Sequence, residues 1–292
     1  MPRLRTLTRL ARPFSLVLAA LTFSFGSGVA RYLGHNLSPA AGLSLLWVFL
    51  LQIASAWLVE YFRSPAEPLA DAETPRQREQ LRTLLLQASA AALTLLAAVT
   101  ILLLAIKVLN PAAMLVMGLA FALMLANAIP PVRLISRGFG EFAQAIFLAY
   151  LIPALAFLQQ TDQLHSLITL LAFPLALLAL AYLLALDFPS YAADLKYRRG
   201  SLLVRLGWER TMPLHHGLVL TAYALLALGP LLGYPLALLW PVFLTFPLAL
   251  YQIFMLRNIS VGAKPVWSLL TANGAAVFAL SAYLLTLTFW LR

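Results

Sequence analysis

The sequence predicts an all-α, polytopic membrane protein with nine transmembrane helices. Its 292 residues are 62% hydrophobic and 10% charged, and the mean hydropathy is +0.89, whereas a soluble domain carries about 25% charged residues. Apolar runs of about twenty residues, long enough to cross a bilayer as a helix, recur along the chain. A β-barrel is disfavoured because these runs do not alternate polar with apolar residues.

The apolar runs define the expected helices and a single domain. They lie at residues 13–33, 40–62, 83–107, 111–129, 140–159, 164–186, 213–230, 235–256 and 266–290. Residues 1–292 should therefore form one membrane domain, with helices 1–4 at about 13–129, helices 5–8 at about 140–256 and helix 9 at about 266–290. The basic segment before Pro13 could belong to a cleaved signal peptide, but the apolar run after it is long for one, so we interpret the run as the first transmembrane helix.

The distribution of basic residues predicts the orientation. When the loops alternate from the basic N-terminus, seventeen of the twenty Lys and Arg residues fall on one side, and the other side holds only Arg31, Lys107 and Arg292. Basic residues concentrate in cytoplasmic loops, so we expect a bacterial cytoplasmic membrane protein with its N-terminus in the cytoplasm and its C-terminus outside. The net charge of +10 then reflects orientation and contact with anionic membrane lipids, and nucleic acid is not an expected partner. The absence of Cys excludes thiolate metal sites.

Two long loops on the cytoplasmic side contain the candidate functional residues. The loops Ser64–Gln80 and Phe188–Met212 follow helices 2 and 6, which are equivalent positions in two successive sets of four helices. This arrangement is typical of an internal duplication with paired functional loops.

Acidic residues cluster where these loops begin. Glu60 and Glu67 mark the end of helix 2, while Asp187 and Asp194 mark the end of helix 6, seven residues apart and on one face if the helix continues through Pro189. Carboxylates that converge in this way suit Mg²⁺ that holds a diphosphate. Nearby basic residues would pair with phosphate oxygens: Lys196, Arg198, Arg199 and Arg205. The alternative is that these are solvated helix ends, with Glu60 and Arg63 forming an interfacial ion pair.

Four stretches in order resemble the UbiA-type membrane prenyltransferases, most closely their 1,4-dihydroxy-2-naphthoate branch. They are Arg12–Leu16, Gln52–Phe62, Pro130–Glu141 and Asp194–Gly207. The resemblance implies a nine-helix bundle around a central, lipid-open cavity. It also implies transfer of an isoprenyl group from a diphosphate donor to an aromatic acceptor, a quinone precursor or pigment-like molecule, with Mg²⁺ held by two Asp-rich motifs. Asn127, at a position where the family usually has Tyr, and Arg137 would then lie near the acceptor pocket.

The chain departs from the family pattern at the implied metal site. The first motif should begin Asn-Asp, with further aspartates three and seven residues on, but this chain has Val59-Glu60, Arg63 and Glu67. In the second motif Asp194 is kept, whereas Ser190 replaces the aspartate four residues earlier. A guanidinium roughly 4 Å from Mg²⁺ would repel the ion by about 8 kcal/mol at an effective dielectric constant of about 20.

Two roles for Arg63 and two functions therefore stay open. Arg63 either swings away or replaces a metal as the counter-charge of the diphosphate, or it pairs with Glu60, Asp187 or Asp194 in a closed salt-bridge cluster. If the protein is an active enzyme, Glu60, Asp187 and Asp194 are catalytic, and Glu67 helps them to hold Mg²⁺. Arg63 then binds the diphosphate together with the four other basic residues. If the protein is catalytically inactive, it is an accessory subunit of a larger membrane complex and binds an isoprenoid, quinone or pigment.

Overall fold

The computed structural model describes residues 2–64, 67–69 and 74–292, and within these ranges the chain is all-α. Nine helical segments of the described chain are long and apolar enough to span a membrane, which confirms the predicted fold class. They are Pro13–Tyr32, Ala41–Tyr61, Pro75–Ala105, Pro111–Ala128, Gly140–Leu158, Ser166–Lys196, Trp208–Leu232, Leu236–Ser260 and Trp267–Trp290.

Several of the spans contain more than one helical element. The first four are the single helices α2 (Pro13–Tyr32), α3 (Ala41–Tyr61), α4 (Pro75–Ala105) and α5 (Pro111–Ala128), and the last is α14 (Trp267–Trp290). The fifth comprises α6 (Gly140–Ile146), the π-helical turn η2 (Phe147–Leu151) and α7 (Ile152–Leu158), and the sixth comprises α8 (Ser166–Asp187), η3 (Phe188–Ser190) and α9 (Tyr191–Lys196). The seventh is α11 (Trp208–Leu228) with η4 (Gly229–Leu232), and the eighth is α12 (Leu236–Leu239), η5 (Trp240–Thr245) and α13 (Phe246–Ser260). Outside the spans lie α1 (Pro2–Leu10), η1 (Leu134–Arg137) and α10 (Leu202–Leu206).

Local capping explains where two helices extend beyond their apolar runs. α4 begins at Pro75 rather than near residue 83 because Thr74 and Gln77 form a reciprocal capping box, which satisfies the first free N–H groups of the helix. The sixth span continues beyond Asp187 through the short 3-10 turn η3, in which Pro189 occupies one of the first positions, where a proline is best tolerated. The helical path thereby reaches Asp194.

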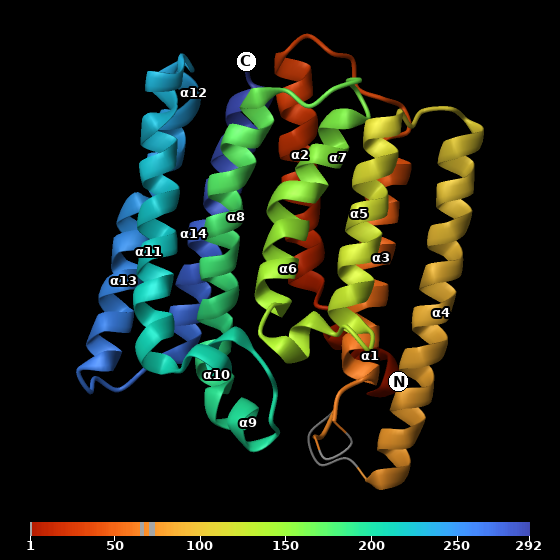
Figure 1. Cartoon of the computed structure of the whole chain (residues 1–292), viewed down its shortest axis with the longest axis vertical. Coiled ribbons are helices and arrows are strands. Elements are labelled where there is room, and N and C mark those ends of the chain that lie inside the picture. Colours follow the sequence, from red (N-terminus) through yellow and green to blue (C-terminus); the bar gives the residue numbers. More distant parts are fainter. Residues whose placement is uncertain (1, 65–66, 70–73) are drawn as a thin grey trace.

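The most buried spans lie in the centre of the bundle. Within an apolar stretch of 18 residues in each span, 72% of the Gly140–Leu158 span and 67% of the Ser166–Lys196 span are buried, against 28% for α4. α2 packs against α7 and α14, and α8 packs against α11 and α14 (Figure 1). The outer face of α4 exposes large apolar side chains such as Ile101 and Leu95, which fits a helix surface in contact with lipid tails.

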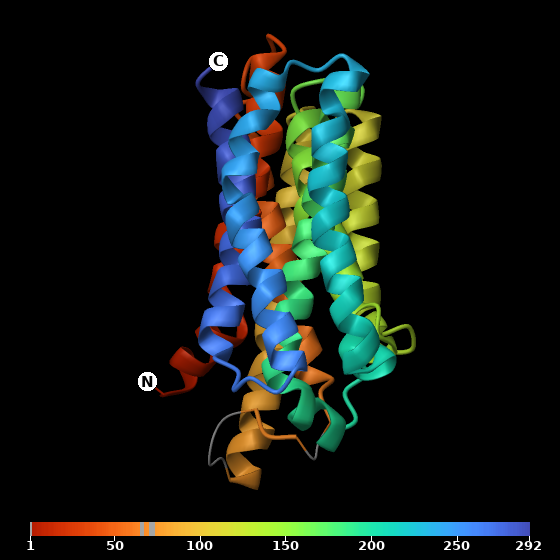
Figure 2. The same cartoon turned by 90° about the vertical axis from the view of Figure 1, so that its left-hand side faces the viewer.

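The two loops that contain the predicted site residues lie at one end of the bundle. α1, α9, α10 and the end of α3 all lie at this end, and the C-terminus lies at the other (Figures 1 and 2). Residues 65–66 and 70–73 of the first predicted loop fall outside the described residues. The tips of the second and sixth spans therefore face the same end, as the sequence predicted.

Candidate functional site

A cavity of about 520 Å³ opens at the end of the bundle where α1 lies. Its walls come from the start of α2, the end of α3, the ends of α5 and α8, and the loops around α6 and α9. Five Asp or Glu residues and five Arg residues line it: Glu60, Glu67, Glu141, Asp187, Asp194, Arg12, Arg63, Arg133, Arg198 and Arg199. We call this cavity the charged pocket. Apolar and aromatic side chains line it as well, among them Phe14, Leu148 and Tyr182.

Arg63 is ion-paired with both carboxylates of its own loop. Its Nη2 lies 2.5 Å from Glu60 Oε2, one helical turn earlier, and its Nη1 lies 3.4 Å from Glu67 Oε1. A second guanidinium, that of Arg12, lies 3.7 Å from Glu60 Oε1. The sequence offered Glu60, Asp187 and Asp194 as ion-pair partners of Arg63, and in the structure the pair with Glu60 forms. Because Glu60 and Glu67 are buried, these contacts compensate charges that would otherwise be costly to remove from water.

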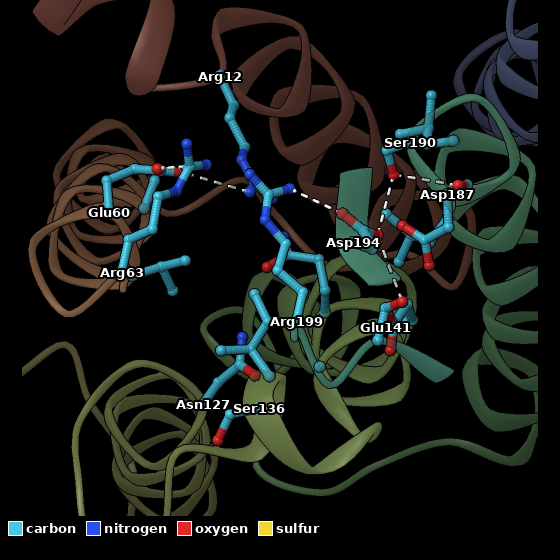
Figure 3. A pocket seen from close by; sticks show the side chains of 18 of the residues that line it. Arg12, Glu60, Arg63, Asn127, Ser136, Glu141, Asp187, Ser190, Asp194 and Arg199 are labelled. Atoms are coloured by element: carbon cyan, nitrogen blue, oxygen red, sulfur yellow. Dashed lines mark hydrogen bonds and ion pairs between the residues drawn. The ribbon is translucent and has the colours of Figure 1, made fainter. Parts of the chain in front are cut away.

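Arg199 connects the two carboxylate-bearing loops. One guanidinium nitrogen contacts Glu67, and Nη1 lies 3.1 Å from Asp194 Oδ1 (Figure 3). Burial, and then the charge of Arg63, lower the pKa of the Arg199 guanidinium to about 10, so it stays protonated at neutral pH. Asp194 also accepts hydrogen bonds from Ser190 Oγ at 3.0 Å and Ser201 Oγ at 3.4 Å. Ser190, the residue found where the family pattern has an aspartate, is therefore a donor to the aspartate that is kept.

Two carboxylates in the pocket are less completely paired. Asp187 Oδ2 and Glu141 Oε2 are buried without a hydrogen-bond partner. The other oxygen of Glu141 accepts a hydrogen bond from the Leu202 backbone N–H at 3.2 Å, which fixes α10 against the start of α6. Both side chains have acceptor capacity left for a ligand, as does the Oδ1 of Asn127, which also lines the pocket and is buried without a hydrogen-bond partner.

The arrangement does not fit the predicted Mg²⁺ site. Within the described residues, no three His, Asp or Glu side chains are grouped closely enough to hold a metal ion. The predicted ligands Glu60, Glu67, Asp187 and Asp194 share one pocket, but the guanidinium of Arg199 lies between Glu67 and Asp194. Glu60, Glu67 and Asp194 each form an ion pair with an arginine, so Mg²⁺ would have to displace these ion pairs to bind.

Three residues predicted to contact substrate lie outside the charged pocket. The Lys196 ammonium lies over the ring of Tyr197, 5.3 Å from its centroid, and Arg205 packs its side chain against Gly138. Arg137, predicted near the acceptor, is exposed and donates to the Pro131 carbonyl at 2.9 Å. Their positions do not support the roles expected from the sequence, whereas the predicted residues Arg198 and Asn127 do line the pocket.

The structure adds residues that the sequence did not single out for the site. Arg12, Arg133 and Glu141 line the pocket. Further in, Gln52 donates to Ser15 Oγ and accepts from Gln144, both at 3.1 Å, so that three helices share one polar network. Arg12, Gln52 and Glu141 all occur in the stretches that carry the family resemblance, and that signal could have found them.

Comparison with known proteins gives matches in structure. No protein-family model and no curated protein sequence matches the chain. A structure of digeranylgeranylglyceryl phosphate synthase aligns with 100% of this chain and 98% of its own, at a TM-score of 0.65 and 15% identity. A UbiA homolog from Archaeoglobus fulgidus bound to GPP and Mg²⁺ aligns with 96% of this chain and 99% of its own, at a TM-score of 0.59 and 19% identity. The same homolog bound to Cd²⁺ aligns at a TM-score of 0.56. At these identities the likeness establishes the fold, so the predicted UbiA-like bundle is confirmed, and the naphthoate branch stays a prediction.

Proposed function

We propose that this protein binds an isoprenyl diphosphate in the charged pocket and transfers the isoprenyl group to an aromatic acceptor, a quinone precursor or a pigment-like molecule. The observation that carries this proposal is the pocket itself, in which five arginines and an apolar, aromatic wall line one cavity in the membrane bundle. Such a site fits an amphiphile with an anionic head and a hydrocarbon tail. The structural neighbours bound to GPP or DMAPP with Mg²⁺ support the choice of a diphosphate.

The residues present suggest a mechanism that uses this chain's own charges. The allylic C–O bond breaks, and its electron pair leaves on the diphosphate, whose growing negative charge Arg63, Arg199 and Arg12 stabilise. A ring carbon of the acceptor attacks the resulting allylic carbocation and forms the new C–C bond. The proton on that ring carbon passes to Asp187, which lines the pocket beside the carboxylate of Glu141.

The test is transfer by the full chain reconstituted in liposomes with labelled GPP and naphthoate, benzoate or chlorophyllide-type acceptors. We expect prenylated product, and Asp187→Asn should lower the rate by roughly 10²- to 10⁴-fold. Asp162→Asn is the matched control, because Asp162 is exposed and lies in the connection between α7 and α8 at the opposite end of the bundle. Equal rates for the two variants would refute the role of Asp187.

A second candidate function follows from the ion pairs. Because arginines already match the charges of Glu60, Glu67 and Asp194, the pocket could hold an isoprenoid, quinone or pigment without turning it over, as an accessory subunit of a larger membrane complex. Retention of labelled GPP without product from any acceptor would favour this candidate. Failure to retain GPP at all would refute the diphosphate site of the first candidate.

A further inference from the structure

We infer that guanidinium groups take the place of divalent metal in the charged pocket, so that Arg63 and Arg199 form a metal-free site for the diphosphate. The inference rests on the proposed ligand, an isoprenyl diphosphate. It assigns that ligand a mode of binding that departs from the Mg²⁺ implied by the family resemblance.

The first observation is which charges face the cavity. The carboxylate side chains of Glu60 and Asp194 are each 3% exposed, whereas the side chains of Arg63 and Arg199 are 20% and 36% exposed. An anion that enters the pocket therefore meets guanidinium groups before carboxylates. The buried carboxylates hold these partly exposed guanidinium groups in place, which lowers the entropy lost when an anion binds.

The second observation is the spacing of the two guanidinium groups. Arg63 Nη1 and a nitrogen of Arg199 both contact Oε1 of Glu67, so one carboxylate oxygen holds the two arginines side by side. A guanidinium presents five N–H donors in a planar fork that matches phosphate oxygens. Two adjacent forks can each receive one phosphoryl group of a diphosphate.

The third observation is that two arginines of the pocket form no direct ion pair. Among the described residues, neither Arg133 nor Arg198 has an ion pair, although both line the pocket. The Nε of Arg133 is buried without a hydrogen-bond partner. A buried donor without a partner is costly unless a ligand satisfies it, and an anionic oxygen is the natural acceptor for a guanidinium.

The experiment is titration calorimetry of the purified full chain in nanodiscs of neutral lipid, with GPP as the probe. We expect the Kd in EDTA to equal the Kd in Mg²⁺ within roughly threefold. Arg199→Gln should weaken binding roughly 10- to 100-fold, the loss expected for charge-assisted hydrogen bonds. Lys196→Gln, three residues earlier and outside the pocket, is the matched control and should leave the Kd unchanged.

A second variant tests the inference independently of whether Arg199→Gln folds. Arg12 has one long ion pair and a half-exposed side chain, so Arg12→Gln should fold normally and still weaken binding, by a smaller factor. Binding of GPP that requires Mg²⁺ would overturn the inference and leave the proposed function standing, whereas no binding in either buffer would overturn the proposed function. Loss of GPP binding when the nanodiscs contain anionic lipid would identify the site as one for lipid headgroups and overturn the inference.

Discussion

Replacing Arg63 with aspartate should convert the charged pocket into a divalent-metal site. Arg63 lies within 3.4 Å of carboxylate oxygens from both Glu60 and Glu67, so Arg63→Asp would place a third carboxylate between two that are already buried. At an effective dielectric constant of about 20, a guanidinium roughly 4 Å from Mg²⁺ repels it by about 8 kcal/mol, and a carboxylate there attracts it by the same amount. The substitution therefore changes the electrostatic free energy of metal binding by about 16 kcal/mol before desolvation.

Only part of that change has to survive for binding to become measurable. A Kd of about 1 mM corresponds to about 4 kcal/mol, roughly a quarter of the electrostatic change. Titration with Mn²⁺, followed by electron paramagnetic resonance, should show one saturable site in Arg63→Asp and none in the wild-type protein. Arg63→Gln removes the repulsion without adding a ligand, and should bind more weakly than Arg63→Asp. Equal affinity of the wild-type protein and a monodisperse Arg63→Asp variant would refute the reasoning.

Three further predictions concern packing, buried polar groups and topology. Gly26→Ala should cost about 1–3 kcal/mol, because a Cβ there would lie 2.1 Å from the Pro153 carbonyl oxygen, whereas Gly118→Ala meets no atom within 4 Å and should not lower the thermal midpoint. Ser44→Ala should cost about 1–3 kcal/mol by leaving the buried Gln159 amide without its hydroxyl partner, and a thermal midpoint unchanged from wild type would contradict this. Alkaline phosphatase fused to the C-terminus should be active, and an inactive fusion would reverse the orientation predicted from the basic residues.

The sequence predicted the spans well because bilayer thickness sets their length. Each predicted run overlaps one observed span, and the differences arise from interactions that hydropathy does not measure, such as the capping box at Thr74. The breaks within spans were not predicted, although the sequence contains a signal for them. Pro153 has no N–H to donate to the Ala149 carbonyl four residues earlier, and the π-helical turn Phe147–Leu151 ends two residues before it.

The site was predictable as a location and much less so as a set of contacts. The ends of the second and sixth spans had to meet if both loops were cytoplasmic, and their carboxylates do line one pocket. The place of Arg199 between Glu67 and Asp194 depends on how the α9–α10 connection packs. Gly200 lies so close to the Ser136 backbone that a Cβ would be 1.8 Å from its carbonyl oxygen. That contact joins segments more than sixty residues apart, and no local pattern in the sequence encodes it.

The charges of the two motifs explain why the departures at Arg63 and Ser190 belong together. The family pattern that the chain resembles has five carboxylates in these motifs, a charge of −5 before any metal is bound. This chain has Glu60, Glu67 and Asp194 with Arg63, a sum of −3 + 1 = −2 without any metal. Had only one position changed, the motifs would carry −3 or −4, and more buried carboxylate charge would depend on Arg12 and Arg199 for compensation. The two differences together reduce the negative charge that a metal would otherwise have to compensate, which agrees with a pocket whose proposed anion-binding groups are arginines.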